Sequence, residues 1–299
     1  MSFDLYFAGS QAKECDDFMI ETGCNRLFSQ LDDKRGVARW CQDIKGNSNK
    51  LFIDSGAFSA LTRGIQIDID EYISKIDAIG EDIYQFANLD VIPSVRDFNH
   101  LSDTFDAGWN NFMYIQAHSK YAYKCCFVFH KGEPESKLDI VISYYKQHPE
   151  LKFFALGGLV GDTDNTLMYC IRICDKIKSE LPYIKIHLFG YTRLNHLPYI
   201  RCDSTDSTTW LKTGATGSIK TRYGLISVSE KQLGNPYNFY NLPIAAQENI
   251  LKEIKDMGFS FEQVSTDYKY RMMYNIKYFK HWSDTYKYKR LGIIKNNLI

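Results

Sequence analysis

The feature that most constrains this chain is a regular alternation of short apolar runs with longer amphipathic stretches over its first two thirds. The short runs are rich in Ile, Phe, Val and Tyr, which favour β-strands, and most of the stretches between them can hold a helix. Strands that are joined through helices pair in parallel, so the pattern predicts βα units. Eight runs are present: LYFAGS from Leu5, NRLFSQ from Asn25, LFIDSG from Leu51, IYQFANLD from Ile83, CFVFHKGE from Cys126, FFALGG from Phe153, KIHLFGY from Lys185 and YIRCDSTD from Tyr199.

Eight strands with intervening helices favour an α/β fold of the (β/α)8 TIM-barrel type, and a doubly wound open sheet is kept as the alternative. No early G-x-G-x-x-G turn marks a dinucleotide site, which would have favoured the open sheet. The chain has 299 residues, a length at which a single barrel often closes. Stretches at 70–80 and 164–181 are two of the expected crossover helices.

The chain changes character beyond Trp210, where the turn-rich segments TGATGSIKTRYG and GNPYNFYNLP predict loops or a hairpin over one face. Two helical patterns follow, one from near Leu242 to a stop signal at Gly258 and one from about Asp267 to Arg290. We therefore divide the chain into a barrel domain with inserted loops over residues 1–258 and a C-terminal helical extension over residues 259–299.

Composition limits the possible partners only in part. The 36 basic and 36 acidic residues cancel, so any nucleic-acid surface has to be local. The N-terminus has no cationic stretch before an apolar run, and no window approaches the ~20 apolar residues that span a bilayer. We expect a soluble cytoplasmic protein without a membrane partner. Its eight cysteines contain no C-x-x-C pair, which favours reduced thiols over disulfides or a zinc site.

Polar residues and glycines gather at the carboxyl ends of the predicted strands, which in a (β/α)8 barrel form the rim that carries the chemistry. They are Asp54, Asp90, His130, Glu133, Gly157, Gly158, Gly190, Asp203 and Asp206. Each of them alone also fits a turn, a helix cap or a core position. The prediction of a functional site therefore depends on their gathering at one rim. Two or three carboxylates around one cavity suit nucleophilic attack and proton transfer at an anomeric carbon. Carboxylates also suit Mg²⁺, so a metal-dependent hydrolase is an alternative.

Six motifs in a fixed order resemble the tRNA-guanine transglycosylase superfamily, and most of all its short branch from bacteriophages and related DNA-modification systems. They are IDSGAF at Ile53, LDVIP at Leu89, VFHKGE at Val128, ALGGLVGD at Ala155, HLFGYT at His187 and DSTTW at Asp206. The resemblance covers roughly residues 5–210. It implies a barrel enzyme that exchanges a guanine in a nucleic acid for a free 7-deazaguanine base, such as 7-cyano-7-deazaguanine, without a cofactor.

The resemblance also implies roles for individual residues. Asp206 matches the aspartate nucleophile of the family, Asp54 the aspartate of proton transfer and Asp90 the aspartate that reads the guanine edge. His130 stands on the strand where the tRNA enzymes carry a base-reading glutamine. Asp203 remains an alternative nucleophile, although the spacing to Trp210 favours Asp206. The implied substrate-binding residues are Asp90, His130, Gly157, Gly158, Ser55 and Gly190.

One departure from the family bears on the polynucleotide. The tRNA enzymes carry a zinc subdomain after the barrel, whereas this chain has no cysteine after Cys202. We therefore expect DNA as the substrate. The same exchange in tRNA is the first alternative, and a non-catalytic paralogue that binds nucleic acid or a protein partner is the second. A homodimer or a partner subunit is left open.

Basic and aromatic residues are interleaved from Lys269 to Lys295, where Asp284 is the single acid. Cations contact phosphates and rings stack on bases, so this segment is a candidate polynucleotide surface. The alternative is a helix that packs its rings on the barrel and leaves its lysines in solvent. The candidate nucleic-acid-binding residues are Lys212, Lys220, Arg222, Lys269, Arg271, Lys277 and Lys280.

Overall fold

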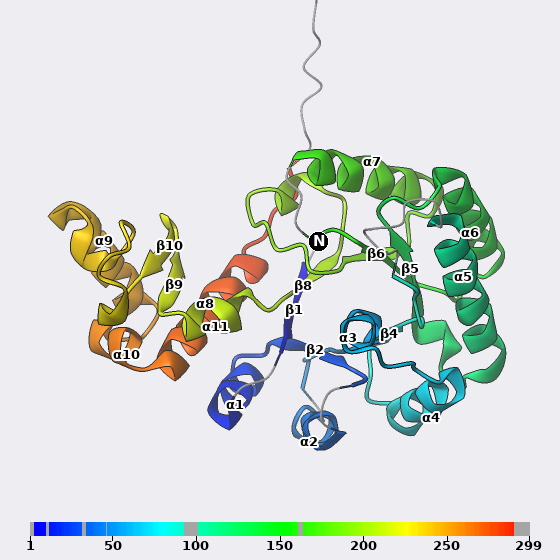
Figure 1. The fold of residues 1–299 in the computed structure, drawn as a ribbon, viewed down its shortest axis with the longest axis horizontal. Coiled ribbons are helices and arrows are strands. Elements are labelled where there is room, and N and C mark those ends of the chain that lie inside the picture. Colours follow the sequence, from blue (N-terminus) through cyan, green and yellow to red (C-terminus); the bar gives the residue numbers. More distant parts are fainter. Residues whose placement is uncertain are drawn as a thin grey trace, which may run out of the picture.

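The computed structural model describes residues 3–9, 12–31, 34–45, 47–92, 101–160 and 164–289, and within them eight parallel strands close into a barrel in chain order (Figure 1). The strands are β1 (Asp4–Ala8), β2 (Asn25–Ser29), β3 (Leu51–Asp54), β4 (Gln85–Ala87), β5 (Cys125–His130), β6 (Phe153–Gly157), β7 (Lys185–Leu188) and β8 (Ser204–Ser207). Each overlaps one predicted strand, and the last begins at Ser204 instead of Tyr199. Because β8 pairs with β1, the sheet is closed and the open-sheet alternative is wrong.

Helices surround the strands, as Figure 1 shows for α1, α2, α4, α5, α6 and α7. The helices up to the end of the barrel are α1 (Lys13–Glu21), α2 (Lys34–Asp43), α3 (Ala57–Arg63), α4 (Ile69–Ile79), α5 (Leu101–His118), η2 (Ala122–Lys124), α6 (Glu135–Gln147), α7 (Asp164–Glu180), η3 (Leu197–Tyr199) and α8 (Thr209–Ala215). Helices α4 and α7 confirm the two crossover helices named from the sequence. Among the residues described, no helix combines the length and the apolar character that crossing a bilayer requires.

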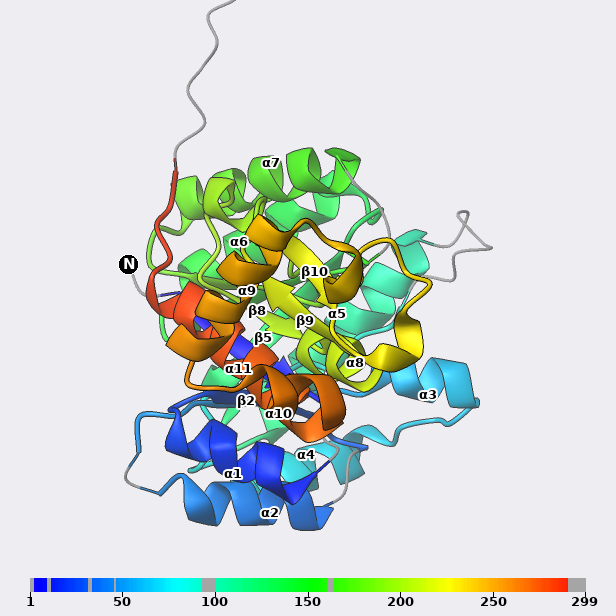
Figure 2. The ribbon, with the colours of Figure 1, turned by 90° about the vertical axis from the view of Figure 1, so that its left-hand side faces the viewer.

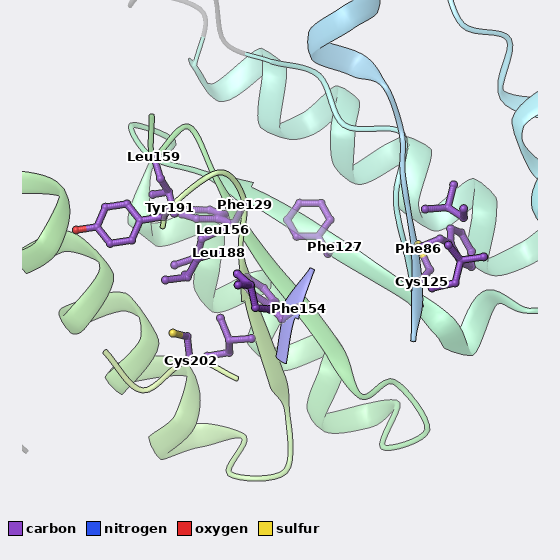
Figure 3. Packing of buried hydrophobic residues seen from close by; sticks show 14 of the residues in the cluster. Phe86, Cys125, Phe127, Phe129, Phe154, Leu156, Leu159, Leu188, Tyr191 and Cys202 are labelled. Atoms are coloured by element: carbon purple, nitrogen blue, oxygen red, sulfur yellow. The ribbon is translucent and has the colours of Figure 1, made fainter. Parts of the chain in front are cut away.

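The core has two layers because successive side chains of a strand point to opposite faces. The outer layer, between strands and helices, contains Phe127, Phe129, Phe154 and Leu156 (Figure 3). The inner layer fills the barrel with Tyr6, Ala8, Leu27, Phe52, Ala87, Cys126, Val128, Phe153 and Ala155. Residues two positions beyond Phe52, Val128 and Ala155 continue the inward series at the carboxyl ends of the strands.

A C-terminal lobe, residues 218–267, stands outside the ring of helices beside α8 (Figures 1 and 2). It contains an antiparallel hairpin of β9 (Ser218–Thr221) and β10 (Gly224–Ser227), then η4 (Glu230–Gln232), η5 (Phe239–Asn241), α9 (Ile244–Asp256) and α10 (Phe261–Thr266). Its own core joins Ile254 to Val264 and to Tyr274 of α11 (Tyr268–Asp284). Residues on both sides of the predicted boundary at residue 258 therefore share one core.

Helix α11 returns from the lobe to the barrel and crosses α8 at Gly214. A Cβ atom at Gly214 would lie 2.6 Å from Met272 Cγ and 3.0 Å from the Met272 backbone nitrogen. The two helices can approach this closely only because residue 214 has no side chain. Gly214 thus couples the lobe to the barrel.

We expect Gly214→Ala to lower the free energy of unfolding by about 1–2 kcal/mol, because overpacking against the α11 backbone outweighs the better helix propensity of alanine. Urea denaturation measures the change. Gly234→Ala is the matched control, since no atom lies within 4 Å of a Cβ there. Equal midpoints for the two variants would contradict the tight crossing.

Candidate active site

The carboxyl ends of the eight parallel strands meet at one rim of the barrel, which we call the mouth. Asp54 ends β3, His130 ends β5, Gly157 ends β6 and Asp206 lies in β8. Asp90 follows β4 by three residues. The structure therefore brings the three aspartates and His130 of the sequence analysis to the same end of the barrel.

His130 lies between two carboxylates. Its Nε2 atom is 3.0 Å from Asp90 Oδ2, and its Nδ1 atom is 3.6 Å from Glu133 Oε1. Glu133 Oε2 also accepts a hydrogen bond of 2.8 Å from the His130 backbone N–H. All three side chains are almost completely buried, so solvent screens these interactions little.

These contacts decide the charge of His130. Burial alone lowers the pKa of the imidazole, but the hydrogen bonds and negative charges of Asp90 and Glu133 outweigh it and raise the pKa to about 9. His130 is therefore an imidazolium at neutral pH: Nε2 donates to Asp90, and Glu133 lies beside Nδ1 at ion-pair distance.

Asp54 and Ser55 complete this wall of the mouth. The Ser55 hydroxyl donates to Asp90 Oδ1 over 2.5 Å, and the Gly56 N–H donates to Asp54 Oδ2 over 3.1 Å. Burial raises the pKa of the Cys126 thiol, and the charges of Asp90 and Asp54 raise it further. Both carboxylates therefore lie close enough to the barrel interior to act on one buried group.

Asp206 stands on the opposite wall, formed by β7, β8 and β1. Its Oδ1 atom accepts a hydrogen bond of 2.6 Å from the Gly190 N–H and lies 3.3 Å from His187 Nε2. Gly190 has a φ of +66°, in the left-handed region that favours glycine. Burial lowers the pKa of His187, although the hydrogen bond and charge of Asp206 oppose the shift, so this imidazole is neutral at pH 7.

Asp203 lies at the other end of the barrel. It precedes β8, and its Oδ2 atom is 2.6 Å from Lys178 Nζ and accepts a hydrogen bond of 2.8 Å from the Ile186 N–H. These contacts tie β7, β8 and α7 together at the amino-terminal rim. Of the two candidate nucleophiles, only Asp206 is at the mouth.

The adjacent glycines of β6 make room for His130. A Cβ atom at Gly157 would lie 2.6 Å from His130 Cδ2 and 2.8 Å from His130 Nε2. Gly158 has a φ of +69°, which lets the chain turn at the rim. Gly157 thus has a packing role that is independent of any ligand.

The candidate nucleic-acid-binding residues do not form one exposed patch. Arg271 is buried, and its guanidinium donates to the backbone carbonyls of Gly214, Val264 and Ser265, so it supports the α8–α11 crossing and is not available at the surface. Lys269 pairs with Glu14, Lys280 with Asp284 and Arg222 with Glu253. Lys212 is exposed, whereas Lys220 and Lys277 are half-buried.

Most described rings of the basic and aromatic segment pack inward. Tyr274 and Phe279 are buried, and Trp282 and Tyr286 contact Phe3. Tyr268, Tyr270 and Tyr288 keep exposed rings. The described rings therefore mainly fit the alternative of a packing helix, and Arg290 and Lys295 lie outside the described residues.

Two further residues belong to this site although no role was assigned to them from the sequence: Glu133 and His187. Glu133 follows β5 and His187 lies in the inward series of β7, so strand parity alone would have pointed to His187. The residues that Glu133 and His187 contact are brought to them by the fold, and the sequence alone does not show these contacts. Within the described ranges, no group of three or more His, Cys, Asp or Glu side chains is arranged to hold a metal ion.

Comparisons with known proteins do not assign the chain to a family. No protein-family model matches the sequence, and no curated protein matches it. The resemblance to the transglycosylase superfamily therefore depends on the six motifs and on their order along the chain.

The raised pKa of His130 predicts a pH dependence of stability. An imidazole whose pKa rises from 6.5 to about 9 on folding contributes about 3 kcal/mol, fully present below pH 6.5 and lost as the pH rises through 9. We expect His130→Gln to flatten the fall in unfolding free energy between pH 6.5 and 9.5, as measured by urea denaturation. His118→Gln is the control, because His118 is exposed and bonds only the Tyr114 carbonyl of its own helix. If the His130 variant kept the full pH slope, the imidazolium would be disproved.

Proposed function

We propose that this protein is a nucleic-acid guanine transglycosylase that exchanges guanine for a free 7-deazaguanine base, in DNA, through a covalent glycosyl-aspartate. One observation carries the proposal. Asp206 lies at the mouth with Oδ1 held by Gly190 and His187, while its second oxygen has no hydrogen-bond or ion-pair partner among the described residues. A carboxylate held through one oxygen and free at the other is suited to attack an anomeric carbon.

The proposed reaction has two displacements at C1′. In the first, Asp206 Oδ2 forms a bond to C1′ as the bond to guanine N9 breaks, and Asp54 supplies the proton that the leaving guanine takes. In the second, the incoming base gives its N9 proton to Asp54 and attacks C1′, which releases Asp206. Two inversions give net retention, and the enzyme returns to its starting protonation state.

Base recognition follows from the wall opposite Asp206. His130 and Ser55 each contact one carboxylate oxygen of Asp90, and each oxygen has a further lone pair to accept a hydrogen bond. The N1–H and N2–H groups of guanine and of 7-deazaguanines are donors that match such an acceptor. The backbone at Gly157 and Gly158 offers further polar groups beside His130. A guanosine has to leave its stack to reach this wall, so the substrate is a flipped or single-stranded nucleotide.

We expect Asp206→Asn to abolish exchange of labelled guanine into nucleic acid and to abolish the covalent adduct, because an amide cannot replace the carboxylate as nucleophile. Filter-binding of label and denaturing gels of the adduct measure both. Asp203→Asn is the matched control, since it loses an ion pair at the other rim and should lower stability while it retains kcat. Exchange at the normal rate by Asp206→Asn would refute the assignment.

Analysis of modified nucleosides distinguishes DNA from tRNA as the substrate. The six motifs resemble most of all the branch of the superfamily found in DNA-modification systems, which favours DNA as the substrate. Nucleoside mass spectrometry of DNA and tRNA from cells that express the protein, with and without the Asp206 carboxylate, identifies both the polynucleotide and the imported base. A modified nucleoside in tRNA alone would reverse the choice.

The cations nearest the mouth are the first candidates for phosphate contacts. Lys212 lies in the short helix α8, which directly follows β8, and Lys269 reaches Glu14 in the first turn of α1. Helix α11 then runs away from the mouth, because Ser283 near its end donates to the carbonyl of Phe3, at the amino end of β1. Lys280 accordingly lies toward the far rim.

Replacing Lys212 and Lys269 with glutamine should lower the slope of log Kd against log salt concentration by about 2, roughly one for each phosphate that is no longer neutralised. Fluorescence anisotropy with single-stranded DNA measures it. Lys280→Gln should leave the slope unchanged, because Lys280 lies near the end of α11, toward the far rim of the barrel. The reverse result would place the polynucleotide along the end of α11.

A further inference from the structure

The His187 side chain is fixed deep in the barrel beneath Asp206. It is 1% exposed, and its ring is surrounded by Phe52 and Phe189, each with its ring centroid at 4.7 Å, and by Tyr6 at 5.7 Å. All three rings meet the imidazole nearly edge to face. This packing leaves the imidazole little freedom to rotate.

The two nitrogens of His187 have different partners. Nδ1 lies 2.9 Å from Ser204 Oγ, and Nε2 lies 3.3 Å from Asp206 Oδ1. A neutral imidazole carries one proton, and an ionised carboxylate can only accept. The proton is therefore on Nε2, and the Ser204 hydroxyl donates to Nδ1. Asp206 therefore sets the tautomer of His187, and Ser204 fits that tautomer as a donor to Nδ1.

The surroundings also favour the neutral form. Burial lowers the pKa of His187, while Asp206 and the more distant Asp4 are the charged groups that oppose this shift. Tyr6, whose ring packs against the imidazole, stays neutral because burial raises the pKa of its hydroxyl well above the usual value. A neutral N–H donor orients Asp206 without the strong charge pairing of an imidazolium, which would reduce the nucleophilicity of the carboxylate.

We infer that His187 is a positioning residue for Asp206: together with the Gly190 N–H it holds Oδ1, and thereby directs Oδ2 toward the sugar carbon. The part of this inference that concerns the sugar carbon rests on the proposed function. Its structural part, a Ser204–His187–Asp206 chain of hydrogen bonds, stands on the contacts alone. Misplacement of a reacting group by about 1 Å can cost about 100-fold in rate.

The kinetic test compares two substitutions at the same buried position. His187→Leu removes the donor, and we expect kcat for guanine exchange to fall about 10- to 100-fold with little change in KM for the free base. His187→Gln can place an amide N–H near the position of Nε2 and should restore kcat to within a few-fold of the unsubstituted protein. Wild-type kcat in His187→Leu, or equal losses in the two variants at equal thermal stability, would overturn the positioning role.

A second measurement separates this inference from the proposed function. Nitrogen-15 NMR of the histidine-labelled protein at pH 7 should show His187 neutral and protonated at Nε2, with a downfield Nε2 proton that moves upfield in Asp206→Ala. Protonation at Nδ1, or at both nitrogens, would overturn the inference even if base exchange occurs. If no base exchange is detected in DNA or tRNA, the proposed function fails and the NMR result still decides the hydrogen-bond chain.

Discussion

The closure of the barrel by β1 and β8 is the constraint on which the site depends. This pairing places Asp206 beside Tyr6, and because strand side chains alternate, it directs Asp206 inward. A slip of one residue would turn the carboxylate toward the helices. Asp203, three positions earlier, has the opposite parity and lies about 10 Å lower along the strand. The β1–β8 register thus places two aspartates that are close in the sequence at opposite ends of the barrel.

The two buried histidines show how partners, rather than burial, decide a charge. His130 and His187 are both excluded from solvent, and burial lowers the pKa of each. His130 has two carboxylates, which overcome the desolvation and leave it charged. His187 has Asp206 and a serine hydroxyl, which do not. The mouth therefore has a charged donor on the proposed recognition wall and a neutral donor behind the proposed nucleophile.

The barrel was predictable because its signal is local. Each strand is a short apolar run between helical stretches, and the inward positions follow from parity once the strands are placed. In the lobe, the β9–β10 hairpin and helix α9 were also predicted, but the way in which they pack together was not. The core of the lobe depends on contacts such as Ile254 with Val264, which the predicted boundary at residue 258 separates.

The positions of the polar residues could be predicted from the sequence, but their interaction partners could not. Strand ends alone located Asp54, Asp90, His130 and Asp206. The burial of Arg271 depends on three carbonyls from α8 and α10 that meet it only after α11 folds back, so its charge misleadingly indicated a surface role. Strand parity points to the inward position of His187, but its partners Ser204 and Asp206 come from the neighbouring strand.

The distribution of charge at the mouth suits a polynucleotide that presents a base and keeps its backbone outside. Asp90, Glu133 and Asp206 surround the interior with one imidazolium among them, so the interior repels phosphate and accepts uncharged N–H donors. Lys212, by contrast, is exposed beyond the end of β8. If the proposed function holds, this separation of charge favours binding of a nucleotide that has left its base stack. Its phosphates are attracted to the rim, while the neutral base and the sugar carbon enter between Asp90 and Asp206.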